Sequence, residues 1–131
     1  MREEWGKATF PMVPGHEIGG VVVAVGDAVT KFAVGQNVGI GCMVDACREC
    51  EYCRAGEEQF CTKGAVFTYN STYKHPHCAE FATGEGGKPA QTYGGYSESI
   101  VCDAAFVCGI PGNLDLAAAT PLLCAGITTF R

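Results

Sequence analysis

The chain has 131 residues, a length that allows one small domain. Hydrophobic residues make up 47% and charged residues 18%, a balance that fits a folded globular protein and excludes a disordered one. Nine Lys and Arg against fourteen Asp and Glu give a net charge of −5, which argues against a nucleic-acid partner because such proteins carry a basic face.

Membrane insertion and export are also disfavoured. The longest apolar run, residues 18–25, already contains two glycines and is far shorter than the roughly 18 to 20 residues that span a bilayer. The first ten residues are rich in charge and lack the apolar stretch of a signal peptide. We therefore expect a soluble, cytoplasmic protein with no membrane partner. In that reducing compartment, nine cysteines indicate metal binding rather than disulfides.

The first third of the chain has the pattern of short strands joined by turns. Residues 20–26 are rich in valine and bounded by glycine, which predicts a strand. Residues 26–28 predict a turn, and residues 34–40 predict a second turn that enters a second strand. Residues 42–63 form a cysteine-rich lobe without periodicity.

The rest of the chain changes character twice. Residues 74–93 are rich in Gly, His, Pro and Thr and predict a surface loop. Residues 96–101 and 105–110 predict further strands. Short helix-forming residues at 116–119 precede Thr120-Pro121, which predicts an N-cap followed by a helix that starts at Pro121.

The cysteine-rich lobe contains four cysteines spaced C-x2-C-x2-C-x7-C: Cys47, Cys50, Cys53 and Cys61. Four thiolates around one ion, with no open position, make a structural zinc site that stabilises the fold and performs no chemistry. One alternative is four unrelated buried or oxidised cysteines. Another is an iron–sulfur cluster, but the ferredoxin pattern ends with a three-residue spacer and Pro, whereas here the spacer has seven residues and Thr62 follows. The spacing favours zinc.

A second constellation is Gly15-His16-Glu17-Ile18-Gly19-Gly20. A lone histidine is usually a hydrogen-bonded polar residue, but the glycines around His16 allow close backbone approach, and Glu17 adds a carboxylate that can ligate or orient. The HExxH pattern of metalloproteases is absent, because Gly20 stands where its second histidine would be.

This segment, with Gly26 and Val29, resembles the signature of zinc-containing medium-chain alcohol dehydrogenases, and the four-cysteine lobe matches the structural zinc loop of that family. Residues 94–97 (GGYS) and 121–128 (PLLCAGIT) resemble its cinnamyl alcohol dehydrogenase-like branch, which uses NADP and interconverts aldehydes and primary alcohols. The resemblance implies a mainly β fold: a GroES-like antiparallel β-barrel with an extruded zinc lobe and a short C-terminal helix. It also implies a homodimeric parent enzyme with a small-molecule alcohol or aldehyde as substrate.

By position in the family pattern, His16 and Cys124 correspond to ligands of a catalytic zinc, and Glu17 to a carboxylate that exchanges there with substrate or water. Zinc with few protein ligands keeps an open position, where it polarises a carbonyl or acidifies an alcohol. We expect Cys124 in the first turn of the helix that begins at Pro121, where the helix dipole favours its thiolate. The alternative role for Cys124 is that of a small buried residue in an apolar helix.

The chain also departs from the family pattern. The family's first catalytic ligand is a cysteine before the GHE segment, and residues 1–15 contain none. The only candidate glycine loop, residues 84–89, fails as a dinucleotide fingerprint because Pro89 occupies the third glycine position. We therefore expect residues 1–131 to be a GroES-like catalytic-domain segment, with its zinc lobe at 42–63, without a cofactor-binding domain, and inactive alone.

Two rival functions follow from the same residues. A non-catalytic zinc-binding GroES-like module would keep the fold without the chemistry. A zinc-free reductase relative is disfavoured, because both His16 and Cys124 are present.

The remaining cysteines, Cys42, Cys78, Cys102 and Cys108, are expected to be plain buried or loop cysteines. His75 and His77 flank Pro76 next to Cys78, and a metal site there is the alternative to an ordinary polar loop.

Overall fold

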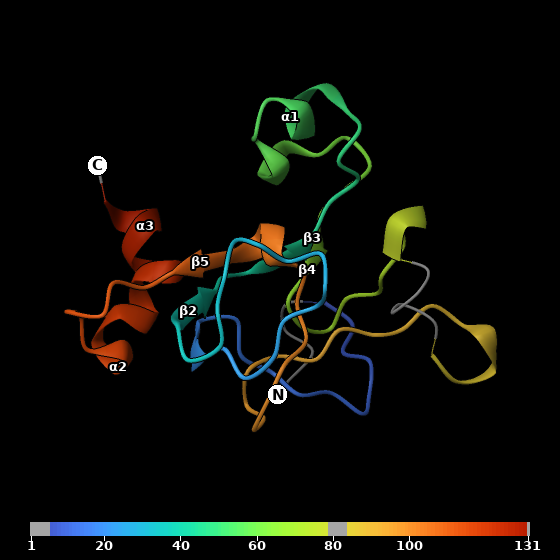
Figure 1. The fold of residues 1–131 in the computed structure, drawn as a ribbon. Helices are drawn as coiled ribbons and strands as arrows, with labels where there is room; N and C mark the ends of the chain where they lie inside the picture. The colour runs from blue at the N-terminus through green and yellow to red at the C-terminus, as the bar shows by residue number, and fades with distance from the viewer. Residues whose placement is uncertain (1–5, 79–83, 131) are drawn as a thin grey trace. The chain divides into compact units, whose positions relative to one another are not determined.

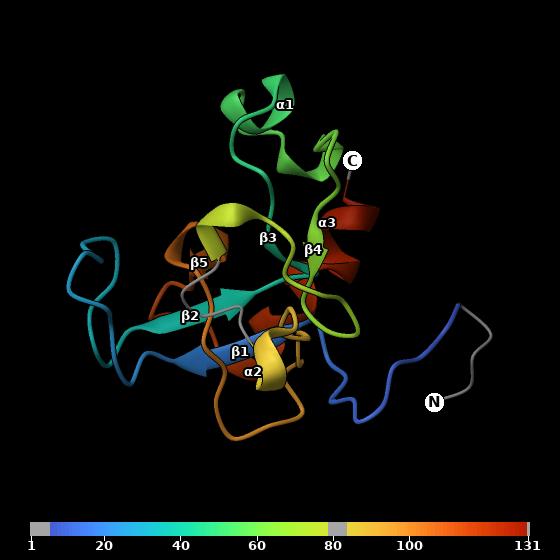
Figure 2. The ribbon, with the colours of Figure 1, turned by 90° about the vertical axis from the view of Figure 1, so that its right-hand side faces the viewer.

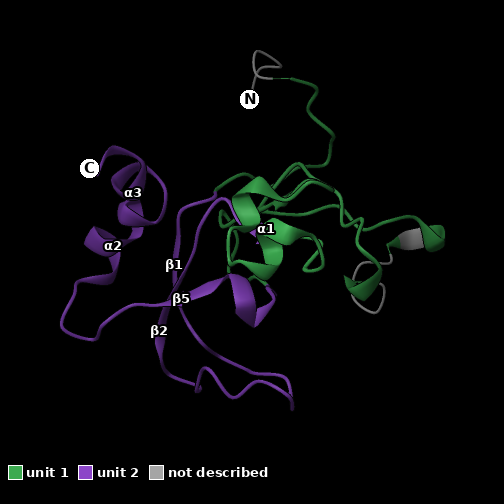
Figure 3. Ribbon diagram, turned by 90° about the horizontal axis from the view of Figure 1, so that it is seen from above, with its two compact units in different colours: residues 1–15, 45–100 green, residues 16–44, 101–131 purple. Residues whose placement is uncertain are grey.

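The computed structural model describes residues 6–78 and 84–130. The chain divides into two compact units, shown in different colours in Figure 3. Unit 1 comprises residues 1–15 and 45–100, and unit 2 comprises residues 16–44 and 101–131. Among the described residues, no helix is long and apolar enough to cross a membrane.

Unit 2 contains a three-stranded antiparallel sheet in the order β1-β2-β5 (Figure 2). Its strands are β1 (Ile18–Val21), β2 (Asn37–Ile40) and β5 (Val107–Gly109), the last preceded by the short 3-10 helix η5 (Ala104–Phe106). Ile40 pairs with Ile18 on one side and with Val107 on the other. Ile40 and Val107 are buried, as expected for β-branched residues that pack on a pleated surface.

The predicted turns of this sheet are confirmed, but its first strand is shorter than predicted. The amide of Val29 donates to the carbonyl of Gly26 at 2.9 Å, which closes the predicted turn, and β2 begins where the second turn ends. The strand predicted over residues 20–26 ends as β1 at Val21, and Val23 is 79% exposed. The valine run has strand propensity, but the side chains of residues 23–25 are exposed and are not packed against a core.

The C-terminal part of unit 2 folds as three short helices: α2 (Leu116–Ala119), the 3-10 helix η6 (Thr120–Leu123) and α3 (Ala125–Thr129). Asp115 caps α2 by accepting a 2.8 Å hydrogen bond from the amide of Ala118. The prediction of one helix from Pro121 with Thr120 as its N-cap is wrong. The Thr120 hydroxyl instead donates back to the Leu116 carbonyl at 2.7 Å, and the backbone of Cys124 (φ −139°) interrupts the helix.

Unit 1 has little regular structure (Figure 1). β3 (Met43–Asp45), of which only Asp45 belongs to unit 1, and β4 (Val66–Phe67) form a two-stranded sheet. The cysteine-rich lobe contains α1 (Glu51–Arg54) and the 3-10 helix η2 (Glu58–Phe60), and the following loop contains the 3-10 helices η3 (Pro76–Cys78) and η4 (Glu85–Gly87). The core side chains of this unit include Val66 and Thr68, which are 0% and 1% exposed.

One further strand prediction is wrong, and the closed barrel is not confirmed. Residues 96–101 contain no strand, and Tyr96 and Val101 are 80% and 88% exposed, so their β propensity is not supported by burial. A closed β-barrel is not found in the described ranges 6–78 and 84–130, whose sheets have three and two strands. The loop predicted at 74–93 is irregular, as expected, apart from η3, η4 and a bridge to Gln91; residues 79–83 of that prediction lie outside the described residues.

Candidate metal sites and family membership

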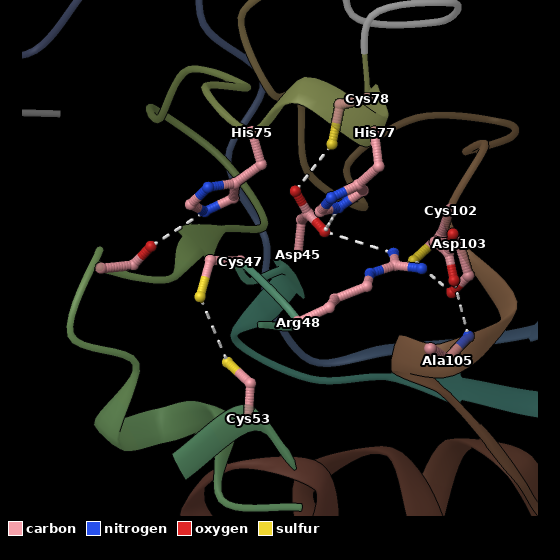
Figure 4. A network of polar contacts seen from close by, with 11 residues as sticks. Asp45, Cys47, Arg48, Cys53, His75, His77, Cys78, Cys102, Asp103 and Ala105 are labelled. Atoms are coloured by element: carbon pink, nitrogen blue, oxygen red, sulfur yellow. Dashed lines mark hydrogen bonds and ion pairs between the residues drawn. The ribbon is translucent and has the colours of Figure 1, made fainter. Parts of the chain in front are cut away.

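The four cysteines of the lobe lie together in unit 1. Their sulfur atoms are all within 4.8 Å of one another, and the sulfurs of Cys47 and Cys53 are 3.8 Å apart (Figure 4). Three of them are buried, and Cys50 is half-buried. All four are free thiols rather than disulfides. The cluster is therefore suited to hold a zinc ion with four thiolates.

Local backbone structure brings these sulfurs together. The amide of Cys50 donates to the Cys47 sulfur at 3.4 Å, and α1 begins directly after Cys50, so that its single turn returns Cys53 to the cluster. Arg48 adopts a positive φ of 62°, which reverses the chain between the first two cysteines. The two-residue spacers thus act as tight turns that bring successive sulfurs together.

The protonation of the cluster also fits a metal site. Amides of Cys53 and Thr62 bond to the Cys50 sulfur and lower the pKa of Cys50 to about 6. Burial, followed by the hydrogen bond with Cys50, raises the pKa of Cys53 to about 12. Burial opposes ionisation of Cys61, but hydrogen bonds with Cys47 hold the pKa of Cys61 below its ordinary value. The lobe therefore favours the thiolate form at Cys50 and Cys61. A divalent cation can displace the remaining protons, because thiolates are the form that binds metal.

The glycine motifs that suggested the family meet in unit 1. Gly15 has a φ of 106°, and the amides of Gly95 and Tyr96 donate to the carbonyls of Gly15 and Pro14, each at 3.0 Å. A Cβ on Gly94 would collide with the backbone of Pro14 and Gly15. The two segments therefore approach each other backbone to backbone, which requires glycine.

In unit 2, Glu17 and Cys124 are neighbours. Oε1 of Glu17 accepts a 2.9 Å hydrogen bond from the amide of Ala125, the residue that follows Cys124. Burial raises the pKa of the Cys124 thiol, and the adjacent Cys42 and the charge of Glu17 raise it further. The expectation that a helix dipole favours the Cys124 thiolate is therefore wrong. Cys124 lies at a helix break, and its neighbours favour the neutral thiol.

His16 lies just before β1 and is half-buried. Within residues 6–78 and 84–130, two groups of potential ligands have all their donor atoms within 4.8 Å of one another, and neither group contains His16. One group is the four-cysteine cluster, and the other consists of Asp45, His77 and Cys78. The assignment of His16, Glu17 and Cys124 to one metal site therefore remains a prediction.

Sequence reasoning missed two residues that the structure places beside candidate ligands. Asp45 is 1% exposed and receives bonds from two side chains of the loop after β4, a contact that no short motif encodes. Cys42, predicted to be a plain buried or loop cysteine, is exposed and forms a side-chain hydrogen bond with Cys124. Its spacing from Cys124 is too long for sequence alone to suggest the pair.

Comparison with known proteins identifies the family. Residues 1–112 match the alcohol dehydrogenase GroES-like domain. The chain belongs to this family. It is 58% identical over 128 residues to the probable formaldehyde dehydrogenase AdhA of Bacillus subtilis, covering 98% of this chain and 33% of that relative. It is 52% identical to the NADP-dependent alcohol dehydrogenase C of Mycobacterium bovis and 47% identical to cinnamyl alcohol dehydrogenase 8 of Arabidopsis thaliana, covering 34% and 32% of these relatives and 99% of this chain.

Solved structures support the same family. The structure of the cinnamyl alcohol dehydrogenase of Helicobacter pylori, complexed with NADP(H), aligns with a TM-score of 0.80 and 43% identity. The alignment covers 97% of this chain and 33% of the Helicobacter pylori chain. The Sorghum bicolor enzyme matches 96% of this chain and 32% of its own with a TM-score of 0.82 and 45% identity. The fold is thus that of the GroES-like N-terminal domain of alcohol dehydrogenases. The chain spans about a third of the length of the relatives it matches.

Proposed function

We propose that this chain forms part of a zinc-dependent oxidoreductase that interconverts alcohols and aldehydes by hydride transfer with NADP(H). The observation that carries the proposal is the position of Glu17 beside Cys124, because these are two of the three residues that the family resemblance assigns to a catalytic metal. The relatives support the reaction class, since they include an NADP-dependent alcohol dehydrogenase and cinnamyl alcohol dehydrogenases. The substrate would be a small alcohol or aldehyde.

In this proposal His16 and Cys124 are the ligands of the catalytic zinc, and Glu17 is the carboxylate that exchanges there with substrate or water. Zinc bound there would supply Lewis acidity to the substrate oxygen. Glu17 is positioned through Oε1 by the Ala125 amide, which leaves Oε2 as the oxygen that can accept a hydrogen bond from a substrate hydroxyl or water. Cys124 has to lose its thiol proton before it can bind a metal. Burial, Cys42 and Glu17 raise the pKa of this thiol and therefore oppose metal binding at this site.

We also infer that Cys47, Cys50, Cys53 and Cys61 hold a structural zinc. The four convergent sulfurs leave no position for a substrate, so this site stabilises unit 1 and takes no part in the reaction. An iron–sulfur cluster is the alternative occupant. The spacing, in which seven residues precede Cys61 and Thr62 follows it, favours zinc.

The proposal concerns the whole enzyme, of which this chain is the metal-carrying part. Hydride transfer requires a nicotinamide held beside the substrate, and no dinucleotide fingerprint is present in these 131 residues. We therefore propose that the chain alone does not turn over, and that the enzyme is a cytoplasmic homodimer. In residues 6–78 and 84–130, His16 belongs to neither of the two compact ligand groups, which favours one second candidate, a non-catalytic zinc-binding module.

The test is NADPH oxidation with cinnamaldehyde and aliphatic aldehydes, first by the 131-residue chain and then by a protein extended to the length of its relatives. We expect activity in the extended protein alone. Substitution of His16→Ala or Cys124→Ala should lower kcat/KM by more than the roughly 100-fold typical of residues that merely support a ligand. Cys108→Ala is the control, because Cys108 is exposed on β5. Full activity of both site variants would favour the non-catalytic module.

A further inference from the structure

Outside the sites discussed above, one cluster has the composition of a metal site: Asp45, His77 and Cys78 in unit 1 (Figure 4). Asp45 ends β3, and the other two residues belong to η3, more than thirty positions later. His77 and Cys78 belong to none of the motifs that carry the family resemblance. The cluster is therefore distinct from the metal sites that the resemblance implies.

The three potential ligand atoms converge closely. Nε2 of His77 lies 2.8 Å from Oδ1 of Asp45, and the Cys78 sulfur lies 2.7 Å from Oδ2 of the same carboxylate. Asp45 and Cys78 are 1% and 0% exposed, whereas the His77 side chain is 31% exposed. The cluster thus has two buried donors and one donor at the surface, which provides access for an ion.

The loop is held in place independently of these contacts. The buried ring of His75 hydrogen-bonds to the Gly64 carbonyl at 3.1 Å. The backbone carbonyl of His75 accepts a hydrogen bond from the Cys78 amide at 3.0 Å. The rings of His75 and His77 stack with their centroids 5.8 Å apart. His77 and Cys78 are therefore presented to Asp45 by an anchored turn, which lowers the cost of ordering them around an ion.

We propose that Asp45, His77 and Cys78 form a second zinc-type site with an open coordination position. Thiolate, imidazole and carboxylate are the three ligand types that zinc takes in proteins, and three protein ligands leave a fourth position for water. Tetrahedral coordination at about 2.0 to 2.3 Å places ligand atoms about 3.3 to 3.7 Å apart, so the present contacts would open by about 1 Å or less.

Binding at this site has a defined proton balance. The thiol hydrogen that Cys78 now donates to Asp45 leaves as a proton to solvent, and the sulfur bonds to the ion. Nε2 of His77, which now donates to Asp45, has to give up that hydrogen before its lone pair can ligate. In the neutral ring this amounts to a shift of the hydrogen through solvent from Nε2 to Nδ1, with no further proton released. No electron transfer is involved.

The positive charge of Arg48 disfavours binding of a cation at this cluster. Its guanidinium lies 3.2 Å from Oδ1 of Asp45 and forms an ion pair with that carboxylate. A divalent cation at the cluster would be repelled by this charge, so removing the charge should strengthen metal binding. Asn is a suitable replacement, since Arg48 has a φ of 62° and Asn tolerates this conformation.

The test is Co(II) titration of the full chain in the Cys124→Ala background, after the four-cysteine cluster has been loaded with one equivalent of zinc. Zinc holds the tetrathiolate site against Co(II), which is lower in the affinity order. We expect one further equivalent of Co(II) to bind and to give the sulfur-to-cobalt charge-transfer band of a single thiolate. Cys78→Ala should abolish this band, and His77→Asn should weaken binding by at least about tenfold.

The variant Arg48→Asn should instead bind Co(II) several-fold more tightly, a gain that a misfolded protein cannot produce. Absence of a thiolate band in the zinc-loaded chain would overturn the proposal. A band unchanged by Cys78→Ala would also overturn it. None of these measurements depends on the dehydrogenase reaction, so a negative result here would not contradict the proposed function. Likewise, inactivity of the extended enzyme would not contradict metal binding at Asp45, His77 and Cys78.

Discussion

The carboxylate of Glu17 and the backbone amide of Ala125 are joined by a 2.9 Å hydrogen bond across 108 positions of the sequence. Ala125 begins α3, so the bond fixes the segment before β1 against the break between η6 and α3. Cys124 lies at that break, and the charge of Glu17 contributes to the raised pKa of its thiol. The carboxylate of Glu17 thus fixes the position of the segment that carries Cys124 and adds to the effect of burial on its thiol.

Glu17→Gln should make Cys124 more reactive. Removing the negative charge lowers the pKa of the thiol, so its thiolate, the nucleophilic form, becomes populated at lower pH. In chelator-treated protein, the pH profile of Cys124 alkylation, followed by peptide mass spectrometry, should move to lower pH. It should remain above that of an ordinary thiol, because burial, the largest cause of the shift, persists. The control is Glu98→Gln at an exposed position; superimposable profiles for both variants would refute the coupling.

Adjacent glycines of β1 should respond differently to alanine. A Cβ on Gly19 would collide with the Thr120 hydroxyl and lie 3.2 Å from Leu116, whereas a Cβ on Gly20 would meet nothing within 4 Å. Gly19→Ala should therefore lower the free energy of unfolding by about 1 to 3 kcal/mol. Gly20→Ala should be neutral or slightly stabilising, because alanine restricts the unfolded chain. Urea denaturation measures both, and equal losses would contradict the packing of β1 on α2 and η6.

The four-cysteine cluster should hold one zinc. Elemental analysis of the purified chain should find one tightly bound zinc and no iron at this cluster, and Cys50→Ser should release the zinc and lower the thermal midpoint, because the binding free energy is part of the folding free energy. Cys108→Ser, at an exposed cysteine of β5, is the matched control. Iron with visible absorbance in the wild-type chain would show that the assignment to zinc is wrong.

Asp45 should matter for stability whether or not a metal is bound. It is 1% exposed and accepts from Cys78, His77 and Arg48. Burial opposes its ionisation, but the bonds from Cys78 and His77 hold the pKa of Asp45 below its ordinary value. Asp45→Asn should cost about 1 to 3 kcal/mol in the free energy of unfolding, because it leaves buried donors poorly satisfied. Asp27→Asn, in an exposed turn, should change it by less than about 0.5 kcal/mol.

Sequence reasoning succeeded where local chemistry decides structure. The turn at Gly26, the strand that became β2 and the convergence of the four cysteines follow from residues within a few positions of one another. The glycines at 15 and 94 were recognised as part of a family pattern, and the structure shows why they are glycines, since their backbones touch.

Sequence reasoning failed where contacts between distant residues determine the local structure. Thr120 looked like a helix cap, but its hydroxyl bonds backwards to Leu116, because Asp115 has already capped an earlier helix. The strand predicted at 96–101 had the right residue types but no buried face to support it. Asp45 and Cys42 acquired their roles from partners more than thirty residues away, which no spacing rule could have indicated.

The most direct test of the proposed function follows the hydride itself. The protein extended to the length of its relatives is supplied with cinnamaldehyde and NADPH that carries two deuterium atoms at C4 of the nicotinamide. The proposal predicts cinnamyl alcohol with one deuterium at its carbinol carbon, formed by the unmodified protein and lost with His16→Ala. Alcohol without the label, or labelled alcohol formed by His16→Ala at the unmodified rate, would contradict the assignment of this chain to a zinc-dependent hydride transfer.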